Sequence, residues 1–406
     1  MFVDKRYMIV TDYLSRLDFN NTEIAFQQKS DKDLAKAYWL FKLVSSPLLI
    51  KVGSPLSNFA LKIGLPIRGL IRDSIYKQFC GGESVSDCQQ AINQLAQAGV
   101  DTILDYSVEG KDAEGNFEAN CLEILRTVAY AKNHGHIPFC VFKASGLGRF
   151  ALFEKKDAGE ILTAAERAEF NRIYSRIDRI CAACHEAGLR VLIDAEHSWI
   201  QESIDDIARD MMEKYNKTAA LVHNTYQLYR TDKLASLQAD FAYAQTQNFY
   251  LGAKLVRGAY MEIERARALR LGYPSPIQKD KAACDRDYNQ ALGFCLNHIN
   301  RIGLVMGTHN EESIRQAVKE MQLRSLSPTN PHIFFAQLLG MSDNITFNLA
   351  AQGFHVAKYM PYGPVASVMP YLARRAQENT SVGGQTGREL SLIIKEKARR
   401  KAKAKH

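Results

Sequence analysis

Between residues 99 and 360 the chain repeats one pattern eight times: a short apolar, β-branched run and then a longer amphipathic segment. Runs of this length predict buried strands, and the longer segments predict helices. Strands that alternate with helices indicate a parallel sheet, because parallel strands need a crossover connection between them. The predicted strands are GVDTILD, IPFCVFK, LRVLIDAE, AALVHN, GAKLVRGAY, GLVMGTHN, HIFFAQ and FHVAKYM.

A closed barrel fits this repeat better than an open sheet. An open doubly wound sheet would absorb about six or seven strands, and no G-x-G-x-x-G follows the first strand. We therefore predict an α/β protein with a (βα)8 TIM-like barrel. Prolines and glycines break the residues before Gly81-Gly82 into short helical pieces. The predicted domains are an N-terminal helical arm (1–82), the barrel (83–390) and a basic C-terminal tail (391–406).

The composition is that of an ordinary globular protein. The chain has 406 residues, 46% of them hydrophobic and 24% charged. We see no signal or transit peptide, and no apolar run of about 18 residues that would span a bilayer. The eight cysteines are scattered, and Cys181 and Cys184 form the only C-x-x-C. They indicate reduced thiols of a cytoplasmic protein rather than a zinc site, and no metal is expected.

Most of the formal net charge of +8 comes from the tail. Residues 395–405, KEKARRKAKAK, carry seven Lys or Arg and one Glu. A frayed, solvated end explains such a tail, and so does contact with an anionic membrane or a nucleic acid. Because no basic aromatic stripe supports base stacking, we expect no nucleic-acid partner.

Polar side chains end each of the eight predicted strands. The active site of a (βα)8 barrel lies at the carboxyl ends of its strands, so these residues indicate a catalytic mouth. The strand-end residues are Asp105, Lys143, Asp194 with Glu196, Asn224, Arg257, His309 with Asn310, Gln337, and Lys358 with Tyr359.

Lys143 and Asp194 end neighbouring strands, where opposite charges keep each other ionised. A structural ion pair explains them equally well. A lysine at a barrel mouth is alternatively a Schiff-base nucleophile, as in an aldolase, but that role needs a lowered pKa. Lys143, Lys254 and Lys358 are the lysines available for it.

Two further motifs suggest a cationic, hydrogen-bonding cleft. In LVRGAY, Arg257 precedes a Gly258-Ala259 turn whose amides can approach a phosphate, and Lys254 lies just before it. THN, residues 308–310, supplies donors and acceptors after the next strand. Each motif alone is ordinary turn chemistry, but together they predict a cleft that suits a dinucleotide cofactor and hydride transfer.

The segment YLARRAQEN follows the eighth strand. At helical spacing, Tyr371, Arg374, Arg375 and Glu378 share one face. A solvated face with an Arg–Glu pair accounts for this pattern. Alternatively, two adjacent guanidinium groups over the barrel mouth would hold a small anion such as a carboxylate.

Several blocks resemble the proline dehydrogenase family over roughly residues 85–385. They are KLVRGAYMEIERARALRLGYPSPI, GTHNEESI, FFAQLLGMSDNITFNLAAQGF, KYMPYGPV and YLARRAQENTS. They are closer to the monofunctional, mitochondrial-like form than to the bifunctional bacterial enzymes. The resemblance implies a distorted barrel whose final helix lies over the active site. Met261 stands where some bacterial members have a tryptophan, so the family's adenine contact does not carry over.

The resemblance also implies a role for each motif residue. As catalytic residues it implies Lys143, Asp194, Tyr359, Arg374 and Arg375, the two arginines binding the proline carboxylate. As walls of the substrate pocket it implies Leu255, Tyr260, Tyr371, and the acidic pair Asp105 and Glu109. As cofactor-binding residues it implies Asn224, Lys254, Arg257, Gly258, Ala259, Thr308, His309, Asn310, Gln337 and Glu378.

The implied activity is the first step of proline catabolism. FAD would oxidise L-proline to 1-pyrroline-5-carboxylate by hydride transfer to flavin N5, and a membrane quinone would accept the electrons. The expected location is the cytoplasm, with peripheral contact to the inner (cytoplasmic) membrane. Two rivals remain, a colourless Schiff-base aldolase and a basic-tailed binding protein on an inert barrel.

Overall fold

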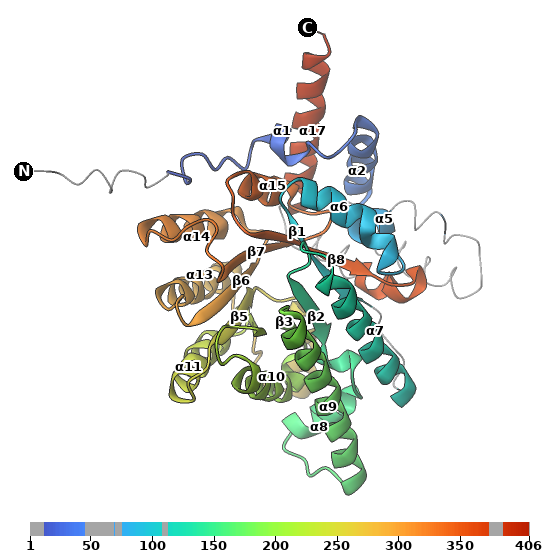
Figure 1. Ribbon diagram of the computed structural model, residues 1–406, viewed down its shortest axis with the longest axis vertical. Coiled ribbons are helices and arrows are strands. Elements are labelled where there is room, and N and C mark those ends of the chain that lie inside the picture. The colour runs from blue at the N-terminus through green and yellow to red at the C-terminus, as the bar shows by residue number, and fades with distance from the viewer. Residues whose placement is uncertain (1–11, 45–68, 70–74, 108–112, 373–384, 406) are drawn as a thin grey trace, which may run out of the picture.

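A computed structural model describes residues 12–44, 69, 75–107, 113–372 and 385–405 of the chain (Figure 1). Within these residues the fold is a barrel of parallel strands with helices outside it. An N-terminal helical arm and a long C-terminal helix lie together at one end (Figure 1).

Eight parallel strands form a closed barrel in sequence order, with β8 paired to β1. The predicted (βα)8 architecture is confirmed. In most strands the boundaries differ from the prediction by about two residues, as expected for boundaries read from sequence. The strands are β1 (Asp101–Tyr106), β2 (Phe139–Lys143), β3 (Arg190–Asp194), β4 (Val222–Gln227), β5 (Leu251–Val256), β6 (Ile302–Gly307), β7 (Ile333–Leu338) and β8 (Val356–Tyr362).

Helices connect the strands and cover the outside of the barrel (Figure 1). Residues 365–372, after β8, are also helical. The α-helices are α1 (Thr22–Ala25), α2 (Asp31–Val44), α5 (Lys77–Phe79), α6 (Gln89–Gln97), α7 (Glu114–Lys132), α8 (Phe150–Asp157), α9 (Ala164–Ala187), α10 (Gln201–Tyr215), α11 (Lys233–Thr246), α12 (Met261–Leu271), α13 (Lys281–Asn297), α14 (Glu311–Leu323), α15 (Asp343–Ala351) and α17 (Gln385–Lys403). Short 3₁₀ helices are η3 (Ser86–Cys88), η4 (Ala144–Gly146) and η5 (Ser198–Ile200).

Local sequence signals explain where the longest of these helices begins and ends. The hydroxyl of Thr163 accepts a hydrogen bond from the backbone N–H of Glu166, whose side chain bonds back to Thr163. This capping box starts α9. Gly188 ends it with a φ of +68°, a conformation that costs glycine little.

The strands separate two apolar cores. Inside the barrel a small cluster includes Ile103, Phe139, Leu192 and Val305. A much larger core lies between the outer faces of the strands and the helices. Because successive side chains of a strand point to opposite faces, every second residue of a strand belongs to the interior. At the carboxyl ends of the strands, the barrel interior is lined by polar residues.

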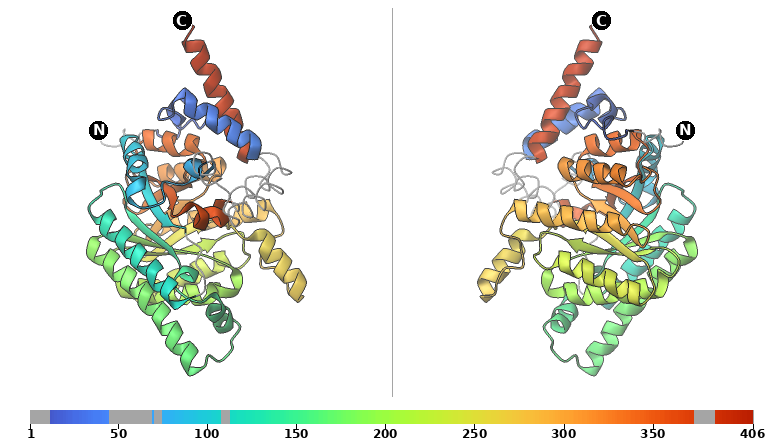
Figure 2. Two further views of the ribbon diagram at one scale, coloured as in Figure 1. Left: turned by 90° about the vertical axis from the view of Figure 1, so that its right-hand side faces the viewer. Right: turned by 90° about the vertical axis from the view of Figure 1, so that its left-hand side faces the viewer.

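The arm and the C-terminal helix pack on each other. Both views in Figure 2 show α17 beside α2 and extending beyond the barrel. Their shared apolar cluster contains Leu34 and Phe41 of α2 and Leu392 and Ile393 of α17. Helix α17 continues through the predicted domain boundary at 390/391, and the domain limits otherwise stay predictions.

The basic tail is helical up to Lys403, and part of its charge is paired. Arg399 lies 2.9 Å from Glu23, and Arg400 lies 2.8 Å from Asp31. Both arginines also pair with Glu396. Residues 399 and 400 of the tail are therefore docked on the arm, whereas residues 401–405 are exposed. Among the described helices none has the length and apolar character to cross a bilayer.

Candidate active site

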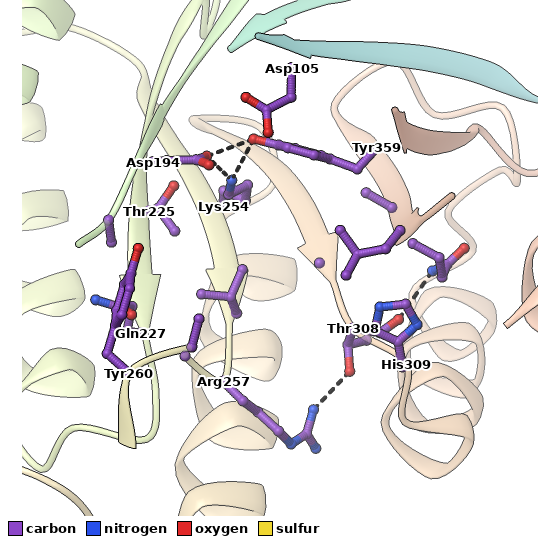
Figure 3. A pocket seen from close by; sticks show the side chains of 18 of the residues that line it. Asp105, Asp194, Thr225, Gln227, Lys254, Arg257, Tyr260, Thr308, His309 and Tyr359 are labelled. Atoms are coloured by element: carbon purple, nitrogen blue, oxygen red, sulfur yellow. Dashed lines mark hydrogen bonds and ion pairs between the residues drawn. The ribbon is translucent and has the colours of Figure 1, made fainter. Parts of the chain in front are cut away.

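A cavity of about 360 Å³ opens at the carboxyl ends of the strands (Figure 3). It contains most of the residues predicted for the site. Its lining is Asp105, Lys143, Asp194, Ala195, Thr225, Gln227, Lys254, Val256, Arg257, Gly258, Ala259, Tyr260, Lys281, Gly307, Thr308, His309, Asn310, Ala336, Gln337, Leu338, Met341, Tyr359 and Tyr371.

Asp194 is the residue around which other charged side chains of this cavity gather (Figure 3). Its Oδ1 accepts hydrogen bonds from the ammonium of Lys254 and, at 2.7 Å, from the hydroxyl of Tyr359. Its Oδ2 lies 3.5 Å from Nζ of Lys143. Burial alone would raise the pKa of Asp194, but Lys254 and Lys143 outweigh burial and lower the pKa below its ordinary value. Asp194 is therefore an ionised carboxylate between two cations.

Lys143 is held as a charged ammonium. Burial lowers the pKa of Lys143, but Asp105 at 3.9 Å and Asp194 at 3.5 Å more than offset this, so the pKa is raised. An amine nucleophile needs the opposite shift. Lys358, whose pKa burial does lower, lies outside the cavity lining and pairs with Asp343 at 2.9 Å. These lysine environments disfavour the Schiff-base aldolase.

Arg257 brings a guanidinium to the cavity wall. Its Nε donates to Asp285 at 2.8 Å, and Nη1 donates to the hydroxyl of Thr308 at 2.8 Å (Figure 3). The guanidinium also lies 4.4 Å from the ring centroid of Tyr288. Asp285 also lies 2.7 Å from Nη2, so these partners hold the guanidinium in one orientation at the cavity wall.

The turn after β5 requires glycine at position 258. Its φ is +131°, and a Cβ there would lie 2.4 Å from a ring carbon of Tyr229. A glycine therefore lets the chain turn closely past the Tyr229 ring. The turn leads to Tyr260, which lines the cavity and whose ring centroid lies 4.2 Å from that of His197.

His309 and Gln337 supply polar groups on the other side of the cavity. Nδ1 of His309 lies 2.8 Å from the hydroxyl of Ser342. Gln337 donates to the carbonyl of Thr308 at 3.2 Å and accepts from the hydroxyl of Thr346 at 2.9 Å. His309 is thus held by Ser342, the residue before α15, and Gln337 of β7 by Thr308 and by Thr346 of α15.

Asn224 and Leu255 lie outside the cavity lining, as do the strand-end residues Glu196 and Lys358. Asn224 donates to Asp205 of α10 at 2.9 Å and does not line the cavity. Leu255 is fully buried in the outer core between strands and helices. Both were expected at the mouth, but strand alternation turns them to the outside of the barrel. The structure therefore does not bring either side chain to the described cavity.

Residues near Asn224 and Leu255 on the same strands line the cavity instead. Thr225 and Gln227 on β4, and Val256 on β5, line the cavity and were not predicted. Strand β4 runs three residues beyond Asn224, so Asn224 does not end the strand. The sequence HNTYQ offered a signal for this placement. Residues two positions apart on a strand share a face, so Thr225 and Gln227 lie on one side.

Four predicted residues lie outside the described part of the chain. They are Glu109 in the acidic pair, and Arg374, Arg375 and Glu378 in YLARRAQEN. Tyr371, the first residue of that motif, is described and lines the cavity.

Comparison with known proteins identifies the family. The sequence model described as proline dehydrogenase matches residues 88–388, which is most of the chain. The chain belongs to the proline dehydrogenase family. It is therefore an oxidoreductase by family, as predicted.

Relatives from several organisms carry this family's names. Proline dehydrogenase 1, mitochondrial, of Dictyostelium discoideum is 33% identical over 95% of this chain and 75% of its own length. Hydroxyproline dehydrogenase of Xenopus laevis is 30% identical over 92% and 88%. The predicted likeness to the mitochondrial form is confirmed. Proline dehydrogenase 1, mitochondrial, of Homo sapiens is 38% identical over 59% of this chain and 40% of its own length.

A solved structure shares the fold. Proline utilization A of Bdellovibrio bacteriovorus, inactivated by N-propargylglycine, superimposes with a TM-score of 0.70 at 17% identity. The match covers 92% of this chain and 41% of that chain. At this identity the likeness shows the fold alone.

Proposed function

We propose that this chain oxidises L-proline to 1-pyrroline-5-carboxylate with FAD as its cofactor. Membership in the family and the names of its relatives support this reaction. The observation that carries the proposal at the site is the cavity in which Lys143 and Lys254 flank an ionised Asp194. Such a cavity suits a small zwitterion, which brings one charge of each sign.

The chemistry of the cavity donors fits FAD. A dinucleotide flavin needs donors for two phosphates and a ring-sized apolar wall. Arg257 and the Gly258 turn offer the cationic and amide donors, and Val256 and Met341 offer apolar surface. When bound, FAD supplies the two-electron oxidation that no side chain here can perform. We propose that Lys254, Arg257, Gly258, Ala259, Thr308, His309, Asn310, Gln337 and Glu378 bind it.

We propose that the chain contacts both the carboxylate and the ring of proline. Arg374 and Arg375 would hold the carboxylate, since adjacent guanidinium groups match it bidentately. Tyr260, Tyr359 and Tyr371 line the cavity and would border the ring. With the carboxylate fixed, the ring carbon that loses hydride has a single position relative to the cofactor.

Asp194 would stabilise the charge that develops during the reaction. The ring nitrogen must lose its proton before its lone pair can support hydride departure, and positive charge then grows on that nitrogen. An ionised carboxylate already oriented by Lys143, Lys254 and Tyr359 needs no rearrangement to oppose this charge. Asp105, which pairs with Lys143, would border the same region together with Glu109.

We propose a membrane quinone as electron acceptor, and peripheral contact with the cytoplasmic membrane. The surface formed by α2 and α17 supports this contact. It exposes Trp39 and Leu43, which are 59% and 55% accessible, and Ile394 at 50%. The ammonium of Lys42 lies 5.0 Å from the Trp39 ring. Exposed aromatic and apolar groups among lysines suit the interface of an anionic bilayer.

Product analysis tests the proposed reaction. Purified protein incubated with L-proline and a soluble dye acceptor should form 1-pyrroline-5-carboxylate and reduce one two-electron dye equivalent per product. Denaturation should release FAD into the filtrate, because we expect the cofactor to be bound non-covalently. Release of FMN, a flavin that stays with the precipitate, or dye reduction without this product would contradict the proposal.

A further inference from the structure

Helix α17 reaches the barrel mouth through two adjacent residues. Arg388 donates from Nε and Nη2 to the two carboxylate oxygens of Glu311, at 2.8 and 3.2 Å. Oε1 of Glu389 accepts a hydrogen bond from the backbone N–H of Ser342. Glu311 begins α14 directly after the cavity residues 308–310, and Ser342 precedes α15 after β7. The C-terminal helix therefore contacts both loops of one cavity wall.

Ser342 has a backbone conformation that needs support. Its φ is +52° and its ψ is +41°, in the left-handed region, which costs a non-glycine residue free energy. The backbone N–H of Ser342 donates a hydrogen bond to the Glu389 carboxylate. Ser342 is 1% exposed, so this N–H has no access to water as a substitute partner. Loss of the Glu389 carboxylate would remove this support from a strained residue.

The side chain of Ser342 contacts a residue of the cavity lining. Its hydroxyl lies 2.8 Å from Nδ1 of His309, which lines the cavity. Its carbonyl accepts from the hydroxyl of Thr346 at 3.2 Å, and the same hydroxyl donates to Gln337 at 2.9 Å. A shift of Ser342 would therefore move the orienting partners of both His309 and Gln337.

Glu389 lies among buried charges that fix its position. It is 4% exposed. Asp343 pairs with Lys358 at 2.9 Å and with Lys29 of the arm at 3.0 Å. Because these neighbours come from the arm, β8 and α15, Glu389 has little freedom to turn away from Ser342.

We propose that Glu389 is a positioning residue for the cofactor side of the cavity, acting through Ser342 on the ring of His309. The inference rests on the proposed function in so far as the cofactor is FAD. It assigns α17 a second role besides packing on the arm. The carboxylate holds Ser342 in its left-handed conformation, and the Ser342 hydroxyl then orients the His309 imidazole toward the cavity.

A double-mutant cycle on cofactor binding tests the coupling. Apoprotein of the wild type, Glu389→Ala, His309→Ala and the double variant is titrated with FAD. We expect Glu389→Ala to raise Kd about tenfold, as for a buried donor left unsatisfied. In the His309→Ala background, the same change should raise Kd less than about twofold, because coupled residues are not additive.

Conservative and control variants separate positioning from general loss of packing. Glu389→Gln keeps an oxygen acceptor for Ser342 and should bind FAD within about twofold of the wild type. Lys395→Ala lies on the same helix and donates only to the Asn20 carbonyl in the arm, so it should leave Kd unchanged. Equal weakening by Glu389→Ala in both His309 backgrounds, or an unchanged Kd for Glu389→Ala, would overturn the proposal.

A second variant and a second readout keep the test decisive. If Glu389→Ala fails to fold, Ser342→Gly replaces it, because glycine adopts the positive φ but lacks the hydroxyl. It should show the same non-additivity with His309→Ala, and additive effects would overturn the proposal. The ¹⁵N signals of His309 in the apoprotein should move in Glu389→Ala but not in Lys395→Ala, and unmoved signals would also overturn it. A wild type that binds no FAD would refute the proposed function alone.

Discussion

The carboxylate of Asp194 lies 3.5 Å from the ammonium of Lys143 because the two residues are register partners on β3 and β2. The ladder fixes their backbones opposite each other at the carboxyl ends of the strands. The second cation, Lys254, comes from β5, which β4 separates from β3 in the barrel. The barrel thus places one carboxylate between two ammonium groups without the help of any loop.

Replacement of Asp194 should cost both stability and activity. Asp194→Asn leaves Lys143 and Lys254 without their shared counter-charge in a buried site, which should destabilise the fold by about 3 kcal/mol. Activity with proline should fall at least about a hundredfold, about the effect of losing one preorganised electrostatic group. Thermal unfolding and kcat/KM measure the two effects. Asp105→Asn, which contacts only Lys143 of the two lysines, is the matched control with a smaller effect.

Glu389 should make stability depend on pH near neutrality. Burial raises the pKa of Glu389 to about 7, Asp343 adds to the rise, and Lys358 and Lys29 oppose it. A raised carboxyl pKa stabilises the fold below the unfolded value near 4.5, and this contribution is lost as pH rises through 7. The free energy of unfolding of Glu389→Gln, relative to that of the wild type, should therefore rise by up to about 3 kcal/mol between pH 5 and pH 8. Urea unfolding at both pH values measures the gain, and a constant difference would contradict the assignment.

Arg257 should contribute to cofactor affinity more than to folding. Arg257→Gln removes a guanidinium held by Asp285 and Thr308 at the cavity wall. Hydrogen bonds to charged groups contribute about 2 kcal/mol, so Kd for FAD should rise about 30-fold. Arg190→Gln is a control, since Arg190 stacks on Phe334 at the opposite end of the barrel. Equal Kd values for the two variants would show that Arg257 does not face the cofactor.

The surface of α2 and α17 should bind anionic vesicles. The double variant Trp39→Ser, Leu43→Ser should bind vesicles containing phosphatidylglycerol more weakly, as measured by co-sedimentation. Lys401→Glu should weaken the binding free energy by about 1 kcal/mol or more. Leu269→Ser on α12 changes a leucine that is 86% exposed on another face and serves as control. Dye-linked activity should persist in every variant. Vesicle binding that all variants retain would remove this surface from the account.

The barrel was predictable because its signal is local and repeated. Each strand run is short, apolar and followed by an amphipathic helix, so a shift of two residues at a boundary leaves the topology unchanged. The site is more sensitive to such shifts. Because β4 continues to Gln227, Asn224 does not end the strand, and Thr225 lines the cavity in its place. On β5, Val256 lines the cavity, whereas Leu255, which the family resemblance implied, faces the outer core.

The contact between α17 and the cavity wall left no signal in the sequence. Glu389 and Ser342 are 47 positions apart, and neither belongs to a motif that indicates pairing. Their contact depends on how the last helix docks against the arm and α15, which is a property of tertiary packing. The same holds for Lys29, whose partner Asp343 lies in another part of the chain.

The central claim is that L-proline reduces a flavin held in this cavity. The direct measurement is the visible absorbance of the purified protein during anaerobic titration with L-proline, with Arg375→Met as a parallel sample. The account predicts a yellow protein whose flavin band bleaches on addition of proline. Bleaching of the Arg375→Met variant should require far more proline, because that variant lacks one of the two proposed carboxylate ligands. A colourless protein, or a flavin band that proline leaves unchanged, would contradict the account.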